Sequence, residues 1–331
     1  MQFDQLHRRE FITLLGGAAA WPLVAHGQQR AKVWRIGLIS GGSRASTFDV
    51  VAAFPQGMRD LGYVEGNDFI MEWRFAEGNY ERIPGFAAEL VQSSIDVFVL
   101  ATGAAIRPVQ QATSIIPIVM GYSTDPVGNG FVASLARPGG NTTGLASSGD
   151  DTSPKQVELL TTIVPNLSRI GFLVNSGNPN SSTVLTSVQA AARLAGLVVV
   201  PVEGRNRVEI EGSFARFSDQ QVGAIMVGAD ATLLIQRRRI AELALQNRLP
   251  SMFVNREYVE AGGLMSYGEN IKEFFRRAAT FVDKIFKGAK PGDLPIEQPT
   301  KFNLTINRKT ADALGLTIPP QLYIFADEVI E

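Results

Sequence analysis

Short runs rich in β-branched and aromatic residues alternate with longer amphipathic runs from Trp34 onward, and this alternation occurs in two successive series. Strands that alternate with helices form a parallel sheet covered by helices on both faces. The sequence therefore predicts an α/β protein with two Rossmann-like, doubly wound lobes. The predicted strands are 35–40, 69–75, 96–101 and 117–121, then 169–174, 197–202, 224–227, 251–254 and 264–267; the predicted helices are 48–61, 80–92, 106–114, 182–195, 208–220 and 233–247.

The boundary between the two series is a turn-rich segment at 137–144, followed by a helix-start pattern. Ser153 is a predicted N-cap, Pro154 suits the first helical position and Gln156 completes a capping box. We expect this helix to open the second lobe.

A late amphipathic helix over 271–286 has a broad apolar face, although the second series already has helices for its strands. We therefore expect the chain to return to the first lobe near Gly268 and to leave it again through 291–299, so that 301–307 forms a strand of the second lobe. Three crossings between lobes make a hinge that can close around a ligand. The predicted N-terminal lobe is 31–146 plus 268–295, and the predicted C-terminal lobe is 147–267 plus 296–331.

The first residues have the features of an export signal. Arg8 and Arg9 precede an uncharged stretch over 11–25, and small residues lie just before Gln28. We predict a twin-arginine signal peptide over 1–27, cleaved after Gly27, and a mature protein free in the periplasm of a Gram-negative cell. The alternative, a buried N-terminal helix, would be interrupted by two glycines and a proline.

Composition excludes several kinds of chemistry. The chain has no cysteine, and cleavage after Gly27 would remove both histidines, His7 and His26. Cysteine or histidine nucleophiles and bases, thiolate zinc sites and disulfides are then impossible, and no Gly-x-Ser-x-Gly elbow is present. We expect no enzyme activity, no cofactor and no metal. The formal net charge of −1 gives no indication of nucleic-acid or membrane binding.

Long motifs in the same order resemble those of the ABC-transporter substrate-binding proteins related to the tryptophan-binding TrpX group. The motifs are Asp125-Pro126-Val127-Gly128 with the segment 131–144, the segment 253–268, and the segments 293–302 and 311–320. The resemblance covers essentially the whole mature chain. It implies a type I periplasmic binding fold, a cleft between two lobes, and delivery of a small solute to a permease in the inner membrane.

Candidate ligand-binding residues follow from the rule that open α/β sheets bind ligands at the carboxyl ends of their strands. The loops after the first and third strands can present backbone amides and hydroxyls to a carboxylate, although each can also be an ordinary strand-to-helix turn. Asp125 is positioned to receive an ammonium group, or else to form the turn before Pro126. The candidates are Ser43, Thr47, Thr102, Gly103, Ala104, Tyr122 and Asp125 in the first lobe, Asn175, Asn178, Asp230, Asn255 and Tyr258 in the second, and Tyr267 at the hinge.

These features predict a monomeric solute-binding component of an ABC importer, with an aromatic or branched amino acid as its ligand. Two alternatives stay open at this point. The ligand can be a small aromatic or aliphatic carboxylate, or the protein can be a sensor that passes its signal to a membrane receptor.

Overall fold

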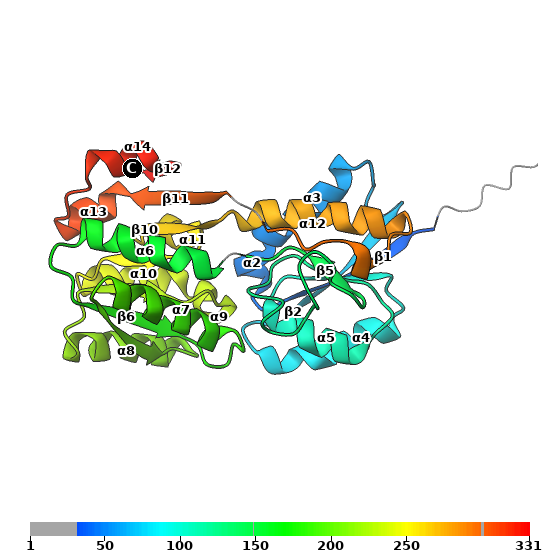
Figure 1. Cartoon of the computed structure of the whole chain (residues 1–331), viewed down its shortest axis with the longest axis horizontal. Helices are drawn as coiled ribbons and strands as arrows, with labels where there is room; N and C mark the ends of the chain where they lie inside the picture. Colours follow the sequence, from blue (N-terminus) through cyan, green and yellow to red (C-terminus); the bar gives the residue numbers. More distant parts are fainter. Residues whose placement is uncertain (1–31, 148, 299–300) are drawn as a thin grey trace, which may run out of the picture. The chain divides into compact units, whose positions relative to one another are not determined.

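Residues 32–147, 149–298 and 301–331 are described by a computed structural model (Figure 1). The predicted signal peptide lies outside these residues. Val33–Glu331 form one compact unit, in which the strands make one sheet of five and one of seven. We call each sheet, with the helices packed on it, the first lobe and the second lobe. The prediction of an α/β fold with two doubly wound lobes is confirmed.

The sheet of the first lobe is parallel throughout, in the order β2-β1-β3-β4-β5. The strand order reverses beside β1, so the loops that follow β1 and β3 leave in opposite directions and open a crevice. Separate apolar clusters cover the two faces of this sheet, one around Leu38 and Val99 and the other around Ile39 and Leu100. The strands are β1 Trp34–Ser40, β2 Phe69–Phe75, β3 Val97–Leu100, β4 Ile118–Met120 and β5 Thr142–Gly144.

The sheet of the second lobe has the order β12-β11-β10-β9-β8-β6-β7. Its strand order reverses beside β6 in the same way. The strand β11 runs antiparallel to β10, and the short β12 pairs with β11 in parallel. The strands are β6 Arg169–Val174, β7 Val198–Glu203, β8 Ala224–Val227, β9 Ser251–Phe253, β10 Met265–Glu269, β11 Phe302–Asn307 and β12 Glu328–Ile330.

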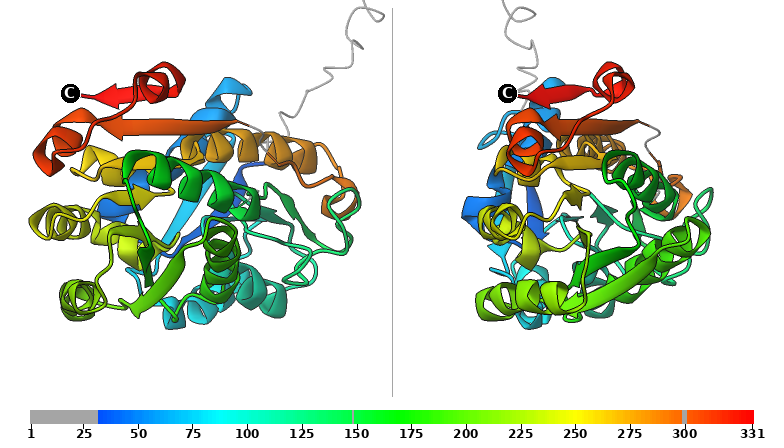
Figure 2. Two further views of the ribbon diagram at one scale, coloured as in Figure 1. Left: turned by 60° about the vertical axis from the view of Figure 1, so that its left-hand side comes forward. Right: turned by 90° about the vertical axis from the view of Figure 1, so that its left-hand side faces the viewer.

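The helix α12 (Ile271–Phe286) follows a strand of the second lobe but packs in the first (Figure 2). Its apolar face buries Phe274, Phe275 and Phe281 against the cluster that includes α3. Gly57 permits the close approach, because a Cβ at that position would lie 2.3 Å from the carbonyl oxygen of Arg276. The other helices of this lobe are α2 Arg44–Val51, α3 Ala53–Asp60, α4 Ile83–Gln92 and α5 Ile106–Ala112, with 3₁₀ turns η1 Tyr80–Arg82, η2 Gly103–Ala105 and η3 Pro291–Asp293.

Three helices differ from the predictions. The helix expected over 48–61 is divided at Ala52 into α2 and α3, and the one expected over 233–247 is divided at Gln236. The helix α6 begins at Gly149, so Pro154 lies inside it and Ser153 is not its cap. Ser153 and Gln156 are buried instead, so packing outweighs the local capping pattern. The helices of the second lobe are α6 Gly149–Ile163, α7 Ser181–Leu194, α8 Arg207–Asp219, α9 Ala231–Ile235, α10 Arg237–Gln246, α11 Arg256–Glu260, α13 Arg308–Leu314 and α14 Pro320–Phe325.

The chain passes between the lobes three times, after β5, between β10 and α12, and before β11. The first two crossings are joined by a buried hydrogen bond, in which Ser147 Oγ donates to Glu269 Oε1 at 2.7 Å. The strand β10 continues to Glu269, and Ile296 packs in the core of the first lobe. Both crossing points therefore lie slightly beyond the expected 268 and 295.

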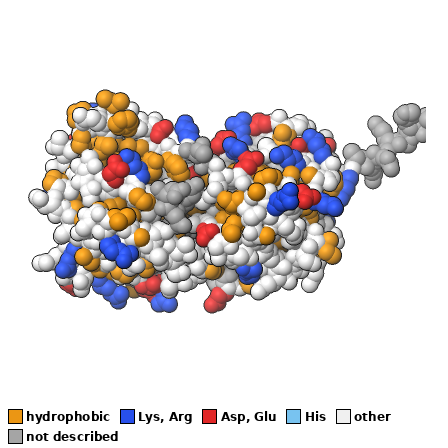
Figure 3. Space-filling model, in the orientation of Figure 1, with side chains coloured by type: hydrophobic (Ala, Val, Ile, Leu, Met, Phe, Trp, Pro, Cys, Tyr) orange, Lys and Arg blue, Asp and Glu red, His pale blue; other side chains and the backbone are white. Residues whose placement is uncertain are grey.

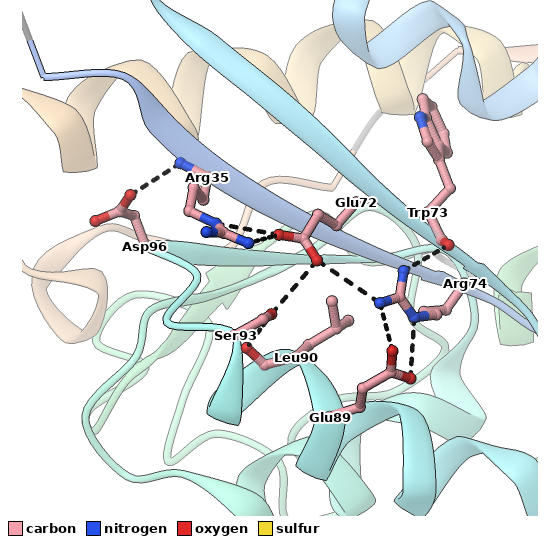
Figure 4. Close-up of polar contacts among 8 residues, drawn as sticks. All are labelled: Arg35, Glu72, Trp73, Arg74, Glu89, Leu90, Ser93 and Asp96. Carbon is pink, nitrogen blue, oxygen red and sulfur yellow. Dashed lines mark hydrogen bonds and ion pairs between the residues drawn. The ribbon is translucent and has the colours of Figure 1, made fainter.

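A charged network ties the edge strand β2 and its neighbour β1 to α4 (Figure 4). Glu72 on β2 pairs with Arg35 on β1, and Arg74 bridges Glu72 at 3.6 Å and Glu89 on α4 at 2.7 Å. The hydrogen bond from Arg74 lowers the pKa of Glu89. These groups are partly exposed, so the network orients the elements more than it stabilises them.

The surface shows Lys and Arg side chains interspersed with Asp and Glu over the face drawn in Figure 3. None of the helices among the described residues has the length and apolar character needed to cross a membrane.

Candidate functional site

A cavity of ≈ 120 Å³ is lined by residues of both lobes. The first lobe contributes the end of β1, the segments after β3 and β4, the helices α2 and α12 and the turn η1, and the second contributes the loops after β6, β8 and β9. The cavity therefore lies at the carboxyl ends of the strands, where the strand-order rule places a ligand. Its polar lining is Ser40, Gly42, Thr47, Tyr80, Thr102, Gly103, Tyr122, Thr124, Asn178, Asn180, Asp230, Asn255 and Glu257.

The remaining lining is apolar and comes from both lobes. Val50 and Val51 on α2 face the cavity together with Ile271 and Phe275 on α12. Phe275 is buried and packs close to Gly121, where a Cβ would lie 2.4 Å from its ring. The first lobe thus supplies an apolar wall with a tyrosine, Tyr122, beside it. The second lobe adds Val184, Ala229, Ala231 and Leu234.

The structure brings seven of the thirteen sequence-predicted residues to this cavity. The rule that ligands bind at the carboxyl ends of strands identifies the loops after those strands. These seven residues lie in or near such loops, and each borders the cavity that the loops enclose. They are Thr47, Thr102, Gly103, Tyr122, Asn178, Asp230 and Asn255.

Three other predicted residues support the lining without being part of it. Ser43 caps α2, and its Oγ accepts a hydrogen bond from Ser46 N at 3.1 Å. Ala104 is buried in η2, next to Gly103. Asn175 Nδ2 donates to Asp230 Oδ1 at 3.2 Å and so helps to orient that carboxylate.

The last three predicted residues do not line the cavity. Asp125 has the left-handed backbone of a turn, with φ of 42°, and its Oδ1 accepts a hydrogen bond from Gly128 N at 2.8 Å. Tyr258 stacks on Phe253 with ring centroids 4.4 Å apart, inside the core of the second lobe. Tyr267 stacks on Phe302. The alternative that Asp125 is a turn residue is therefore the one that the geometry favours.

Sequence reasoning missed several lining residues. Tyr80, Asn180 and Glu257 all lie in segments that follow a strand, so the same rule could have found them. Ile271 follows the end of β10 and could also have been found in this way. Phe275 could not, because it reaches the cavity from the second turn of α12, which is distant in sequence from the other first-lobe walls.

Asp230 is the most densely hydrogen-bonded group of the site. Its Oδ2 accepts from Tyr80 Oη at 2.8 Å and from Asn178 Nδ2 at 3.1 Å. Its Oδ1 accepts from Asn175 Nδ2 at 3.2 Å and from Leu233 N at 2.9 Å. Asp230 thereby caps α9 and holds three side chains, one of which belongs to the other lobe.

Tyr80 joins the two lobes directly. Besides donating to Asp230, its hydroxyl accepts a hydrogen bond from Ala231 N at 3.3 Å, and nearby Thr232 Oγ1 donates to the carbonyl oxygen of Gly78 at 3.2 Å. Burial, and next the negative charge of Asp230, raise the pKa of Tyr80 well above its ordinary value. The tyrosine stays neutral and acts as a hydrogen-bond donor across the cleft.

The charge of the lining is uneven. Asp230 and Glu257 are its acidic side chains, and none of the described lining residues is Lys, Arg or His. Among residues 32–147, 149–298 and 301–331, no group of three His, Cys, Asp or Glu side chains could hold a metal ion. The cavity suits a small molecule that carries a positive group and an apolar body.

A larger groove of ≈ 670 Å³ lies on the second lobe alone, beside the edge strand β7. It is lined by residues of β7, α7 and α8, including Leu185, Pro201 and Arg216. Filling this groove would not join the two lobes, so we regard the smaller cavity as the candidate site.

Comparisons with known proteins agree with this geometry. The model of a family described as ABC transporter substrate binding protein matches residues 36–330. A tyrosine-binding protein of Clostridioides difficile (strain R20291) is 24% identical over 264 residues, which cover 80% of this chain and 75% of that protein.

Two solved structures are similar over 90% of this chain and 100% of their own. One is the ABC domain from Streptococcus pneumoniae in complex with L-Trp, with 28% identity and a TM-score of 0.84. The other is a conserved domain protein from Vibrio cholerae, with 26% identity and a TM-score of 0.85.

Proposed function

Because this chain belongs to the ABC transporter substrate-binding protein family, we propose that it binds one aromatic or branched amino acid between its lobes and delivers it to an ABC permease. Solute binding is the property of the family. We choose an amino acid as the ligand because the described residues that line the cavity include acidic side chains and no basic ones. We choose an amino acid with an apolar side chain because residues of α2 and α12 form an apolar wall.

The observation that carries the proposal is an acidic, base-free lining beside an apolar wall. A simple carboxylate would bring a negative charge to a site that already holds two. Like charges about 5 Å apart repel by roughly 3 kcal/mol at an effective dielectric constant of about 20. An α-amino acid also carries an ammonium group, which is attracted to an acidic side chain of the lining instead of being repelled by it. The amino acid is therefore favoured over the simple carboxylate.

The other parts of the cavity fit the rest of an amino acid. The hydroxyl of Thr102 and backbone N–H groups near Gly103 are available for a carboxylate on the first-lobe side. Val51, Ile271 and Phe275 provide the apolar surface for a side chain. The volume of ≈ 120 Å³ corresponds to roughly ten water-sized spheres, which is the scale of one amino acid.

The relatives support the same choice. One is a tyrosine-binding protein and another was crystallised with L-Trp. An aromatic amino acid is therefore the first ligand to test.

The test is isothermal titration calorimetry on the mature chain, 28–331, refolded to remove any ligand retained from the host cell. We expect L-tyrosine, L-phenylalanine, L-tryptophan or L-leucine to bind, and sugars and nucleosides not to bind. Binding of 3-phenylpropanoate as tightly as L-phenylalanine would refute the argument from charge. Absence of binding to every amino acid, with protein shown to be folded, would refute the proposal.

Export is part of this proposal. We propose that residues 1–27 form a twin-arginine signal peptide and that the mature protein acts as a monomer in the periplasm. We propose no catalytic role. Replacement of Arg8 and Arg9 by lysine should block export, and the secreted protein should begin at Gln28 in N-terminal sequencing. A cytoplasmic, uncleaved wild-type protein would contradict this part.

A further inference from the structure

The cavity has two carboxylates, and only one of them is free to receive the ammonium group of a ligand. A carboxylate has about four lone-pair sites. Asp230 already accepts four hydrogen bonds, from Tyr80, Asn178, Asn175 and Leu233, at 2.8 to 3.2 Å. An ammonium group could bind Asp230 only by displacing one of these donors, each of which has its own structural role.

Glu257 is in the opposite situation. It lies in the first turn of α11, is partly exposed, and borders both the cavity and an adjoining groove of ≈ 230 Å³. Among the described residues, no group donates a hydrogen bond to its carboxylate and no cation forms an ion pair with it. The carboxylate of Glu257 therefore has all of its acceptor capacity available.

The basic residues near Glu257 do not neutralise it. Arg256, its neighbour in the chain, is directed to Glu260 at 2.9 Å and to Glu328 at 3.0 Å. Lys272 borders the same groove, but within the described residues it makes no ion pair with Glu257. A negative charge that borders a ligand cavity without a protein partner is a suitable receptor for a cationic ligand group.

We propose that Glu257 is the residue that binds the ammonium group of the ligand and thereby selects α-amino acids over the corresponding carboxylic acids. This inference rests on the proposed function and deepens it. The carboxylate of the ligand then binds the first lobe, at Thr102 and Gly103, and its ammonium group binds the second lobe. The contacts that recognise the ligand therefore also hold the lobes together.

Asp230 has a different task in this scheme. It organises the second-lobe wall and fastens it to Tyr80, and it acts on the ligand only through the position of that wall. Glu257 is thus the specificity-determining residue, and Asp230 is a positioning residue.

The experiment compares two ligand pairs that differ only in the amino group: L-tyrosine with 3-(4-hydroxyphenyl)propanoate, and L-tryptophan with indole-3-propanoate. Each is titrated calorimetrically into the wild-type chain and into Glu257→Gln. The matched control is Glu260→Gln, which removes a carboxylate one turn later on α11 that pairs with Arg256 and does not line the cavity. Thermal unfolding of each variant checks that it is folded.

We expect Glu257→Gln to weaken binding of the amino acid by about 10- to 100-fold, since a hydrogen bond to a charged group is lost. Binding of the deaminated analogue should stay unchanged or become tighter, because a like charge is removed. Glu260→Gln should change neither. Equal weakening of both ligands, or no weakening of the amino acid, would overturn the assignment while leaving the proposed function intact. If the wild-type chain binds no amino acid, the proposed function and this inference fail together.

Discussion

Tyr80 connects the two lobes through its hydroxyl, which can be removed alone. In Tyr80→Phe the aromatic ring remains, while the hydrogen bond to Asp230 Oδ2 at 2.8 Å and the weaker one from Ala231 N at 3.3 Å are lost. We expect this change to destabilise the closed arrangement of the lobes without unfolding either lobe.

The free energy lost in Tyr80→Phe can be estimated from the hydrogen bonds that Asp230 keeps. A hydrogen bond to a charged acceptor contributes about 1.5–3 kcal/mol, most of it when the acceptor would be left without other partners. Asp230 keeps three donors, from Asn175, Asn178 and Leu233, so the lower end applies. About 1.5 kcal/mol corresponds to a roughly tenfold smaller closing constant. When the free protein is mostly open, the apparent Kd rises by the same factor, because only the closed fraction holds the ligand fully.

Calorimetry measures this change in Kd, and a fluorescence pair with one dye on each lobe measures closure. The matched control is Tyr63→Phe, because Tyr63 Oη also donates to a carboxylate, Asp283 Oδ1 at 2.9 Å, but within the first lobe. Tyr80→Phe should weaken L-tyrosine and its deaminated analogue equally and should favour the open form, whereas Tyr63→Phe should lower only thermal stability. An unchanged Kd in Tyr80→Phe, or a change for the amino acid alone, would refute the reasoning.

Other substitutions test the packing and the electrostatics. Gly57→Ala should lower the free energy of unfolding by about 1–3 kcal/mol, since its Cβ would lie 2.3 Å from the backbone oxygen of Arg276. The control Gly212→Ala, in an open position of α8, should raise that free energy by about 0.5–1 kcal/mol. Equal Tm shifts for the two variants would contradict the close contact at Gly57. Gly103→Ala should weaken ligand binding, since its Cβ would lie 2.4 Å from Asn180 Nδ2; calorimetry in an Asn180→Ala background should show a smaller loss, and strict additivity would exclude the clash. Burial and the hydrogen bond to Asp283 raise the pKa of Tyr63 to about 12, so the stability that its neutral form provides is present below about pH 10, the ordinary tyrosine value, and is lost as the pH rises toward 12. Between about pH 10 and 12, the free energy of unfolding measured with denaturant should therefore fall more steeply with pH in the wild type than in Tyr63→Phe. Parallel pH profiles of the two proteins would disprove the raised pKa of Tyr63.

The elements of both lobes were accessible to sequence reasoning because strands and helices reflect local periodicity. The ranges predicted for β6 and β8 agree with those observed, and the apolar face of α12 indicated a helix that needed a partner outside its own series. Helix limits that depend on packing were not accessible. The start of α6 at Gly149 contradicts the local capping pattern at Ser153, since burial of neighbouring residues outweighs the contribution of one cap. The break at Ala52 was not indicated by any local pattern.

The sequence by itself determined the loops that border the cavity, because parallel strands align their carboxyl ends whatever their side chains are. Only the tertiary structure decided which side chains face it. Asp125 turns toward its own loop and Tyr258 toward the core, whereas Phe275 reaches the cavity from α12. Likewise, only the fold shows that the carboxylate of Asp230 is occupied, because its donors come from different segments and one of them, Tyr80, comes from the other lobe. The direction of a side chain and the number of its partners depend on contacts distant in sequence, which no local pattern encodes.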